Sequence, residues 1–142
     1  MINSSLSKQS FWAKWLVVTY AVFILFGLSM VIFPNLTAQL FSFILFSNSK
    51  EIVKWNDEIV AYVQLIHAIL GAVIAALASL MLMLASGWIS GTEVSKWRML
   101  FIALMVWLIP DTTYSLLNGF WQNAVFNMGF AVPVLVGLMR IR

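Results

Sequence analysis

Four long runs of apolar residues, nearly free of charged side chains, dominate the chain and occupy about 15–33, 59–86, 95–117 and 121–139. A helix needs about 20 apolar residues to cross a hydrocarbon layer about 30 Å thick. Inside lipid the backbone must satisfy its own hydrogen bonds, which leaves helices as the solution for runs of this length. We therefore predict an all-α integral membrane protein, a bundle of four transmembrane helices forming a single membrane domain over 1–142.

The composition supports this class and excludes several others. Of the 142 residues, 63% are hydrophobic and 9% are charged, whereas a soluble domain has about 25% charged residues. Cysteine is absent, which excludes disulfides, thiol redox chemistry and thiolate metal sites. The net charge is +3, but the basic residues are scattered around the ends of the apolar runs. We therefore predict contact with membrane lipids, no nucleic acid partner and no cofactor.

The distribution of basic residues predicts an orientation. One side of a four-span chain carries six of them: Lys8, Lys14, Lys96, Arg98, Arg140 and Arg142. The other side carries Lys50 and Lys54, offset by Glu51, Asp57 and Glu58. Cytoplasmic loops are enriched in Lys and Arg. This bias predicts both termini in the cytoplasm, the 34–58 loop outside, and the plasma (inner) membrane as the location.

The segment between the first two spans is apolar but too short to cross a bilayer. Pro34 is expected to end the first helix. Asn35, Gln39 and Ser42 then recur at helical spacing, with apolar residues on the other side. This pattern is typical of an amphipathic helix that lies in the interface plane. The alternative is an irregular loop rich in Phe and Leu.

The later spans carry two further structural signals. The second span is rich in small residues that recur every three or four positions, such as Gly71, Ala75 and Ala78. Small side chains let helices approach closely in lipid, so this helix is expected to face the bundle. Asn118 and Gly119 predict a tight turn between the third and fourth spans.

Polar residues are concentrated between 110 and 127 in this otherwise apolar chain. A carboxylate in a membrane segment costs a few kcal/mol and normally needs a partner, which makes Asp111 the strongest single signal. His67, the only histidine, is a candidate partner. At about 1.5 Å per residue, His67 lies about 13 Å, and Asp111 and Asn127 each about 9 Å, below the outer ends of their spans. Their similar depth predicts one polar pocket in the outer leaflet, with the segment 35–46 as a lid.

The predicted ligand-binding residues are Gln64, His67, Trp107, Asp111, Tyr114, Asn123 and Asn127. Asp111 and His67 would supply polar recognition, Tyr114 and Asn127 would orient the ligand, and Trp107 would form an aromatic floor. One histidine and no cysteine predict no metal site. Each residue also has a structural interpretation: Asp111 as a carboxylate at a kinked helix end, His67 as a neutral histidine bonded to another helix, and the asparagines as interhelical bonds.

The sequence is compatible with four functions. The favoured hypothesis is a protein that binds a small amphipathic molecule or lipid without catalysis. A proton-coupled small-molecule carrier would use Asp111 as the titrating group. A membrane-embedded lipid or isoprenoid enzyme would use His67 and Asp111 as an acid/base pair. A purely structural subunit would bond Asp111 and the asparagines only to one another. The apolar exterior is compatible with a homo-oligomer or with a partner in a membrane complex.

Overall fold

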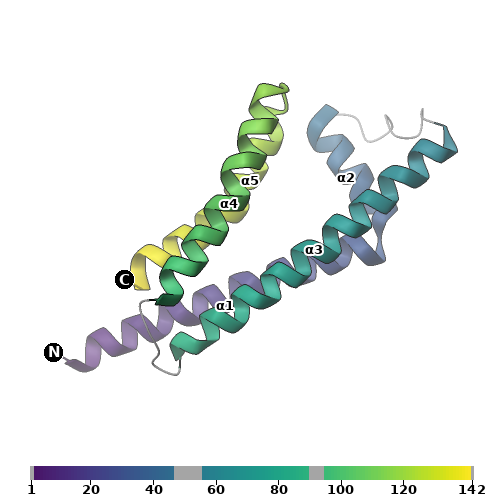
Figure 1. Cartoon of the computed structure of the whole chain (residues 1–142). Coiled ribbons are helices and arrows are strands. Elements are labelled where there is room, and N and C mark those ends of the chain that lie inside the picture. Colours follow the sequence, from purple (N-terminus) through teal and green to yellow (C-terminus); the bar gives the residue numbers. More distant parts are fainter. Residues whose placement is uncertain (1, 47–55, 90–94, 142) are drawn as a thin grey trace. The chain divides into compact units, whose positions relative to one another are not determined.

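A computed structural model describes residues 2–46, 56–89 and 95–141, and the side chains of residues 11–46, 56–87 and 96–141. Nearly all of this described part is helical (Figure 1). The helices are α1 (Ile2–Ile32), α2 (Pro34–Phe46), α3 (Asp57–Ile89), α4 (Ser95–Leu117) and α5 (Trp121–Ile141).

Four of these helices are long and apolar enough to cross a membrane: their spans are Phe11–Ile32, Asp57–Gly87, Lys96–Leu117 and Trp121–Ile141. The predicted all-α integral membrane class is therefore confirmed. Lys50, Glu51 and Lys54 in the predicted outer loop lie outside the described residues. The side of the membrane on which the termini lie stays a prediction.

The chain divides into two compact units. Unit 1 comprises Met1–Ala21 and Ser79–Arg142, and unit 2 comprises Val22–Ala78. Helices α1 and α3 each contribute to both units, α2 belongs to unit 2, and α4 and α5 belong to unit 1.

In unit 2, α1 and α3 approach closely at a pair of glycines. A Cβ built on Gly27 would lie 2.5 Å from the Gly71 carbonyl oxygen and 2.7 Å from the Ala75 backbone nitrogen. A Cβ on Gly71 would lie 2.5 Å from the Gly27 carbonyl oxygen and 2.5 Å from the Met30 Cβ. Gly71, Ala75 and Ala78 are buried, so the predicted packing role of the small residues in the second span is confirmed. Only glycine fits at this contact.

Helix α2 confirms the predicted helix after Pro34 and excludes the irregular loop. Pro34 is its first residue, a position where a missing N–H is harmless. Its buried face carries Thr37, Ala38 and Ser42. Large apolar side chains are exposed on another face, at Leu36, Leu40 and Phe43. Ser42 therefore lies on the buried face and not, as the sequence pattern suggests, with Asn35 and Gln39 on a polar side.

In unit 1, α5 is held by indole groups from two other helices. Trp15 Nε1 of α1 donates to the Pro133 carbonyl oxygen at 2.9 Å. Trp97 Nε1 of α4 donates to the Leu138 carbonyl oxygen at 2.8 Å. Pro133 lies inside α5, as Pro110 lies inside α4, and both helices continue through their prolines. The hairpin of α4 and α5 positions the polar residues described next.

Candidate functional site

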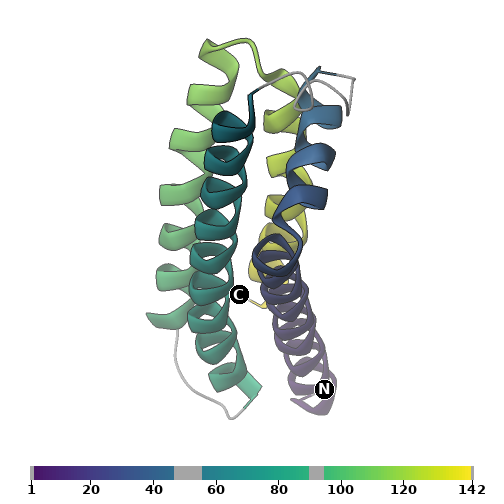
Figure 2. The ribbon, with the colours of Figure 1, turned by 90° about the vertical axis from the view of Figure 1, so that its right-hand side faces the viewer.

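The site is built on the turn that joins α4 and α5, visible at the upper end of both helices in Figures 1 and 2. Gly119 has a φ of 81°, a conformation that favours glycine. The Phe120 N–H donates to the Ser115 carbonyl at 2.8 Å, and the Gly119 N–H donates to the Leu116 carbonyl at 3.2 Å. These two bonds define a Schellman helix end. The predicted turn at Asn118–Gly119 is confirmed, and it turns α5 back along α4.

Three side chains from the two helices form a hydrogen-bonded group that we call the Asp111 cluster: Asp111, Ser115 and Asn123. Asn123 Nδ2 donates to Asp111 Oδ1 at 3.1 Å and to Ser115 Oγ at 2.8 Å. Ser115 Oγ lies 2.8 Å from the Asp111 backbone oxygen and 3.4 Å from its Oδ1. A hydroxyl has one proton to donate, and the shorter bond to the backbone is the stronger. Asn123 is therefore the main donor to the carboxyl group.

The two carboxyl oxygens of Asp111 have unequal environments. Asn123 Nδ2 and Ser115 Oγ both lie within 3.4 Å of Oδ1, and no donor among the described residues hydrogen-bonds to Oδ2. Asp111 is half-buried and lies six residues from the end of α4, about 9 Å along the helix axis. An acidic group in a membrane span is costly until it is paired. The cluster therefore leaves one carboxyl oxygen open to a donor from outside it.

A second polar pair lies deeper in the hairpin. Asn127 is 3% exposed, and its Nδ2 donates to Thr112 Oγ1 at 3.3 Å. Asn123 and Asn127 lie one helical turn apart, so both face α4. The two asparagines, Asn127 buried and Asn123 half-buried, thus bond α5 to α4 from positions one turn apart on α5.

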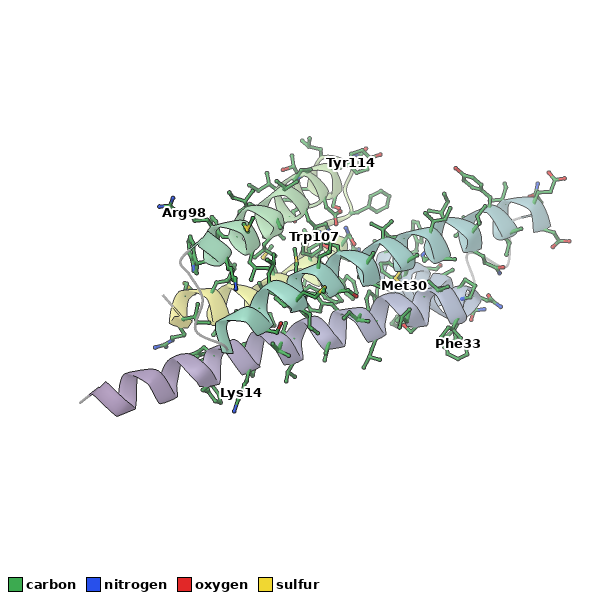
Figure 3. The ribbon with its side chains drawn as sticks, turned by 60° about the horizontal axis from the view of Figure 1, so that its bottom comes forward. Lys14, Met30, Phe33, Arg98, Trp107 and Tyr114 are labelled. Atoms are coloured by element: carbon green, nitrogen blue, oxygen red, sulfur yellow. The ribbon has the colours of Figure 1, made fainter. Side chains whose placement is uncertain are left out.

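The sequence-predicted residues separate into those inside and outside this cluster. Asp111 and Asn123 belong to the cluster, and Asn127 lies one turn beyond Asn123 on α5, where it bonds to Thr112. Trp107 is half-buried one turn before Asp111 on α4. Tyr114 is 69% exposed and projects outward from the end of α4 (Figure 3), so the structure does not bring it into the cluster.

Two hydroxyls of the site, Ser115 and Thr112, were not among the predicted ligand-binding residues. Ser115 is four residues after Asp111 and Tyr114 is three residues after it, so both share a helix face with Asp111. Spacing alone therefore left the choice between Tyr114 and Ser115 open. Thr112 has no signal in the sequence beyond its place next to Asp111.

His67 and Gln64 lie on α3 in unit 2, where both are half-buried. His67 Nδ1 lies 2.8 Å from the Val63 carbonyl oxygen. A carbonyl only accepts, so Nδ1 carries the proton and Nε2 is the acceptor in the neutral ring. Phe41 of α2 packs against the histidine ring, with centroids 5.4 Å apart in an edge-to-face geometry. The segment predicted as a lid thus contacts His67, while a pocket shared by His67 and Asp111 stays a prediction.

The described residues contain no group of three His, Asp or Glu side chains able to hold a metal ion. The Asp111 cluster and the pair of Asn127 and Thr112 together offer one carboxyl group, two amides and two hydroxyls for hydrogen bonding.

No protein-family model, curated protein or solved structure matches the chain.

Proposed function

We propose that the protein is a non-enzymatic membrane component that binds a small amphipathic molecule or lipid at the Asp111 cluster. The observation that carries this proposal is the open oxygen of Asp111: Oδ1 accepts from Asn123, whereas Oδ2 accepts from no described residue. An acidic side chain in a membrane span without enough donors is expected to take one from a ligand.

The chemistry of the site indicates the kind of ligand. A carboxylate accepts hydrogen bonds and does not donate them. The Asn123 amide protons are already used by Asp111 and Ser115. The ligand is therefore expected to bring a hydrogen-bond donor or a cation, such as an amine or hydroxyl head group. Trp107, one turn deeper on α4, would pack against its apolar part.

A purely structural role is the second candidate, and a specific observation favours it. Asn123 and Asn127 both donate to partners on α4, as expected for amides that bond two membrane helices together. Under this alternative Oδ2 pairs with a donor from another subunit of a membrane complex, and the isolated chain carries no ligand.

Native mass spectrometry of the detergent-purified chain distinguishes these functions. The variants are Asp111→Asn, which keeps an acceptor for Asn123 but removes the acid, and Glu58→Gln, a matched control at an exposed acid outside the cluster. Ligand binding predicts a specific bound mass in the wild type and in Glu58→Gln that is lost in Asp111→Asn. A wild type without bound mass, whose Asp111→Asn variant is only less stable, would establish the structural role instead.

A further inference from the structure

Three tryptophans whose side chains the structure describes lie at one end of unit 1, where the span of α1 begins and the span of α5 ends. Two of them are satisfied within the protein, because Trp15 and Trp97 donate to carbonyl oxygens of α5. The third, Trp12, has a buried indole N–H with no hydrogen-bond partner in the part of the chain that the structure describes. A buried donor without an acceptor is costly and needs an explanation.

The neighbour of Trp12 is a cation. The Arg140 guanidinium carbon lies 5.9 Å from the centroid of the Trp12 ring, within the range of a cation–π contact. Arg140 is exposed in the last turn of α5, and no acidic side chain among the described residues forms an ion pair with it. Phe11 and Trp15 pack edge-on against the Trp12 ring. The aromatic cluster therefore holds the indole in place beneath the guanidinium.

The chemistry of this pair specifies what it binds. A guanidinium has five N–H donors and no acceptor, and an indole has one donor and no acceptor. Their common partner must therefore be an acceptor, and the positive charge favours an anion. The planar guanidinium pairs with two phosphate oxygens at once.

The position of the pair identifies the source of the anion. Trp12 follows the first residue of its span, and Arg140 precedes the last residue of its own, Ile141. Both residues thus lie at the level of the lipid head groups, where tryptophan and arginine are enriched. We propose that Arg140 and Trp12 form a binding site for the phosphate of an anionic phospholipid. Arg140 pairs with the phosphate, and the Trp12 N–H beside it supplies a donor for a further oxygen of the same group.

Two other cations near this end provide internal controls. Lys14 and Arg98 are exposed and point away from their helices (Figure 3). They contribute to the positive field that attracts anionic lipids in general, but in the described residues neither lies over an aromatic ring. Replacing Arg98 removes the same charge as replacing Arg140 without touching the Trp12 pair.

The test measures the affinity of the purified full chain for phosphatidylglycerol and for phosphatidylcholine, by lipid titration in detergent with native mass spectrometry. The preference for the anionic lipid is compared within each variant, so any general loss of stability cancels. We expect Arg140→Gln to reduce this preference about tenfold, as for a lost charged hydrogen bond, and Arg98→Gln to leave it nearly unchanged. Trp12→Phe keeps an aromatic ring but lacks the N–H, and we expect it to reduce the preference by a smaller factor.

Two results would overturn the proposal. Equal losses in Arg140→Gln and Arg98→Gln would mean that only the overall charge attracts the lipid. Competition by millimolar inorganic phosphate that removes the bound lipid would mean that the pair is a site for free phosphate.

Discussion

Two helix contacts in this protein hold helices together by opposite means. In unit 2, α1 and α3 meet where Gly27 faces Gly71, so the backbones touch with almost no side chain between them. In unit 1, α4 and α5 meet through the amides of Asn123 and Asn127, which reach across to α4. In lipid there is no hydrophobic drive between helices, and close packing and interhelical hydrogen bonds are the two available substitutes.

The difference between the contacts has a consequence for function. The glycine contact uses no polar group and leaves nothing to bind a ligand. The polar contact places a carboxyl group in the membrane and leaves one of its oxygens open. A membrane helix pair joined by polar side chains therefore also offers polar groups that can recognise a molecule. A pair joined by packing alone offers no such groups.

The largest effect is expected for Gly71→Ala. Its Cβ would lie 2.5 Å from the Gly27 carbonyl oxygen, and the backbones must separate to relieve the overlap. We expect a loss of about 2 kcal/mol in the free energy of unfolding, typical of an overpacked contact. Gly129→Ala is the matched control, because no atom lies within 4 Å of its added Cβ, and alanine there should stabilise the helix slightly. Unfolding in mixed detergent measures both, and equal effects would contradict the glycine contact.

The next effect is expected for Asn123→Ala, which removes both interhelical hydrogen bonds of the Asp111 cluster. We expect a loss of about 1.5 kcal/mol, since interhelical bonds in membranes contribute about 0.6–1.7 kcal/mol each. Asn118→Ala is the control, because Asn118 Nδ2 donates only to the Tyr114 carbonyl of its own helix. The free energies of unfolding of the two variants are compared in the same detergent. A loss as large in Asn118→Ala would show that the interhelical bonds do not stabilise the hairpin.

A third prediction concerns the turn that aligns the polar contact. Gly119→Ala places a side chain at a φ of 81°, which costs about 1 kcal/mol for residues other than glycine. Asn tolerates this conformation better, so Gly119→Asn should lose less. In thermal unfolding, the midpoint temperature should fall in the order wild type, Gly119→Asn, Gly119→Ala. The reverse order for Asn and Ala would exclude backbone conformation as the cause.

The smallest effect is expected for the pair of Asn127 and Thr112. Their hydrogen bond, from Nδ2 to Oγ1 at 3.3 Å, joins two uncharged groups. A double-mutant cycle with Asn127→Ala and Thr112→Val should give a coupling energy of about 0.6 kcal/mol, the average for interhelical bonds in a membrane protein. The same cycle on Asp111 and Asn123 should give more, because one partner is an acid. Equal couplings would remove the distinction between the recognition cluster and a plain structural pair.

The polar contact was only partly predictable from the sequence. Its location followed from residues that are rare in membrane spans, since Asp111, Asn123 and Asn127 stand out in an apolar chain. Its partners did not follow, because Tyr114 and Ser115 are both one turn from Asp111. The structure selects Ser115 and leaves Tyr114 exposed. For the glycine contact, the small residues of α3 are recognisable in the sequence, but no sequence signal indicates Gly27 as their partner.

Four apolar spans, the end of the first helix at Pro34 and the turn at Gly119 follow from the sequence, because length, proline and glycine act on the local backbone. Which of the apolar residues of α4 are buried depends on the packing of the helix against its neighbours. Leu104 is 3% exposed and Val106, two residues later, is 68% exposed, although both are apolar. In a soluble protein the outer face would be polar and would reveal the inner one. In a membrane both faces are apolar, so the rotation of each helix is set by its neighbours.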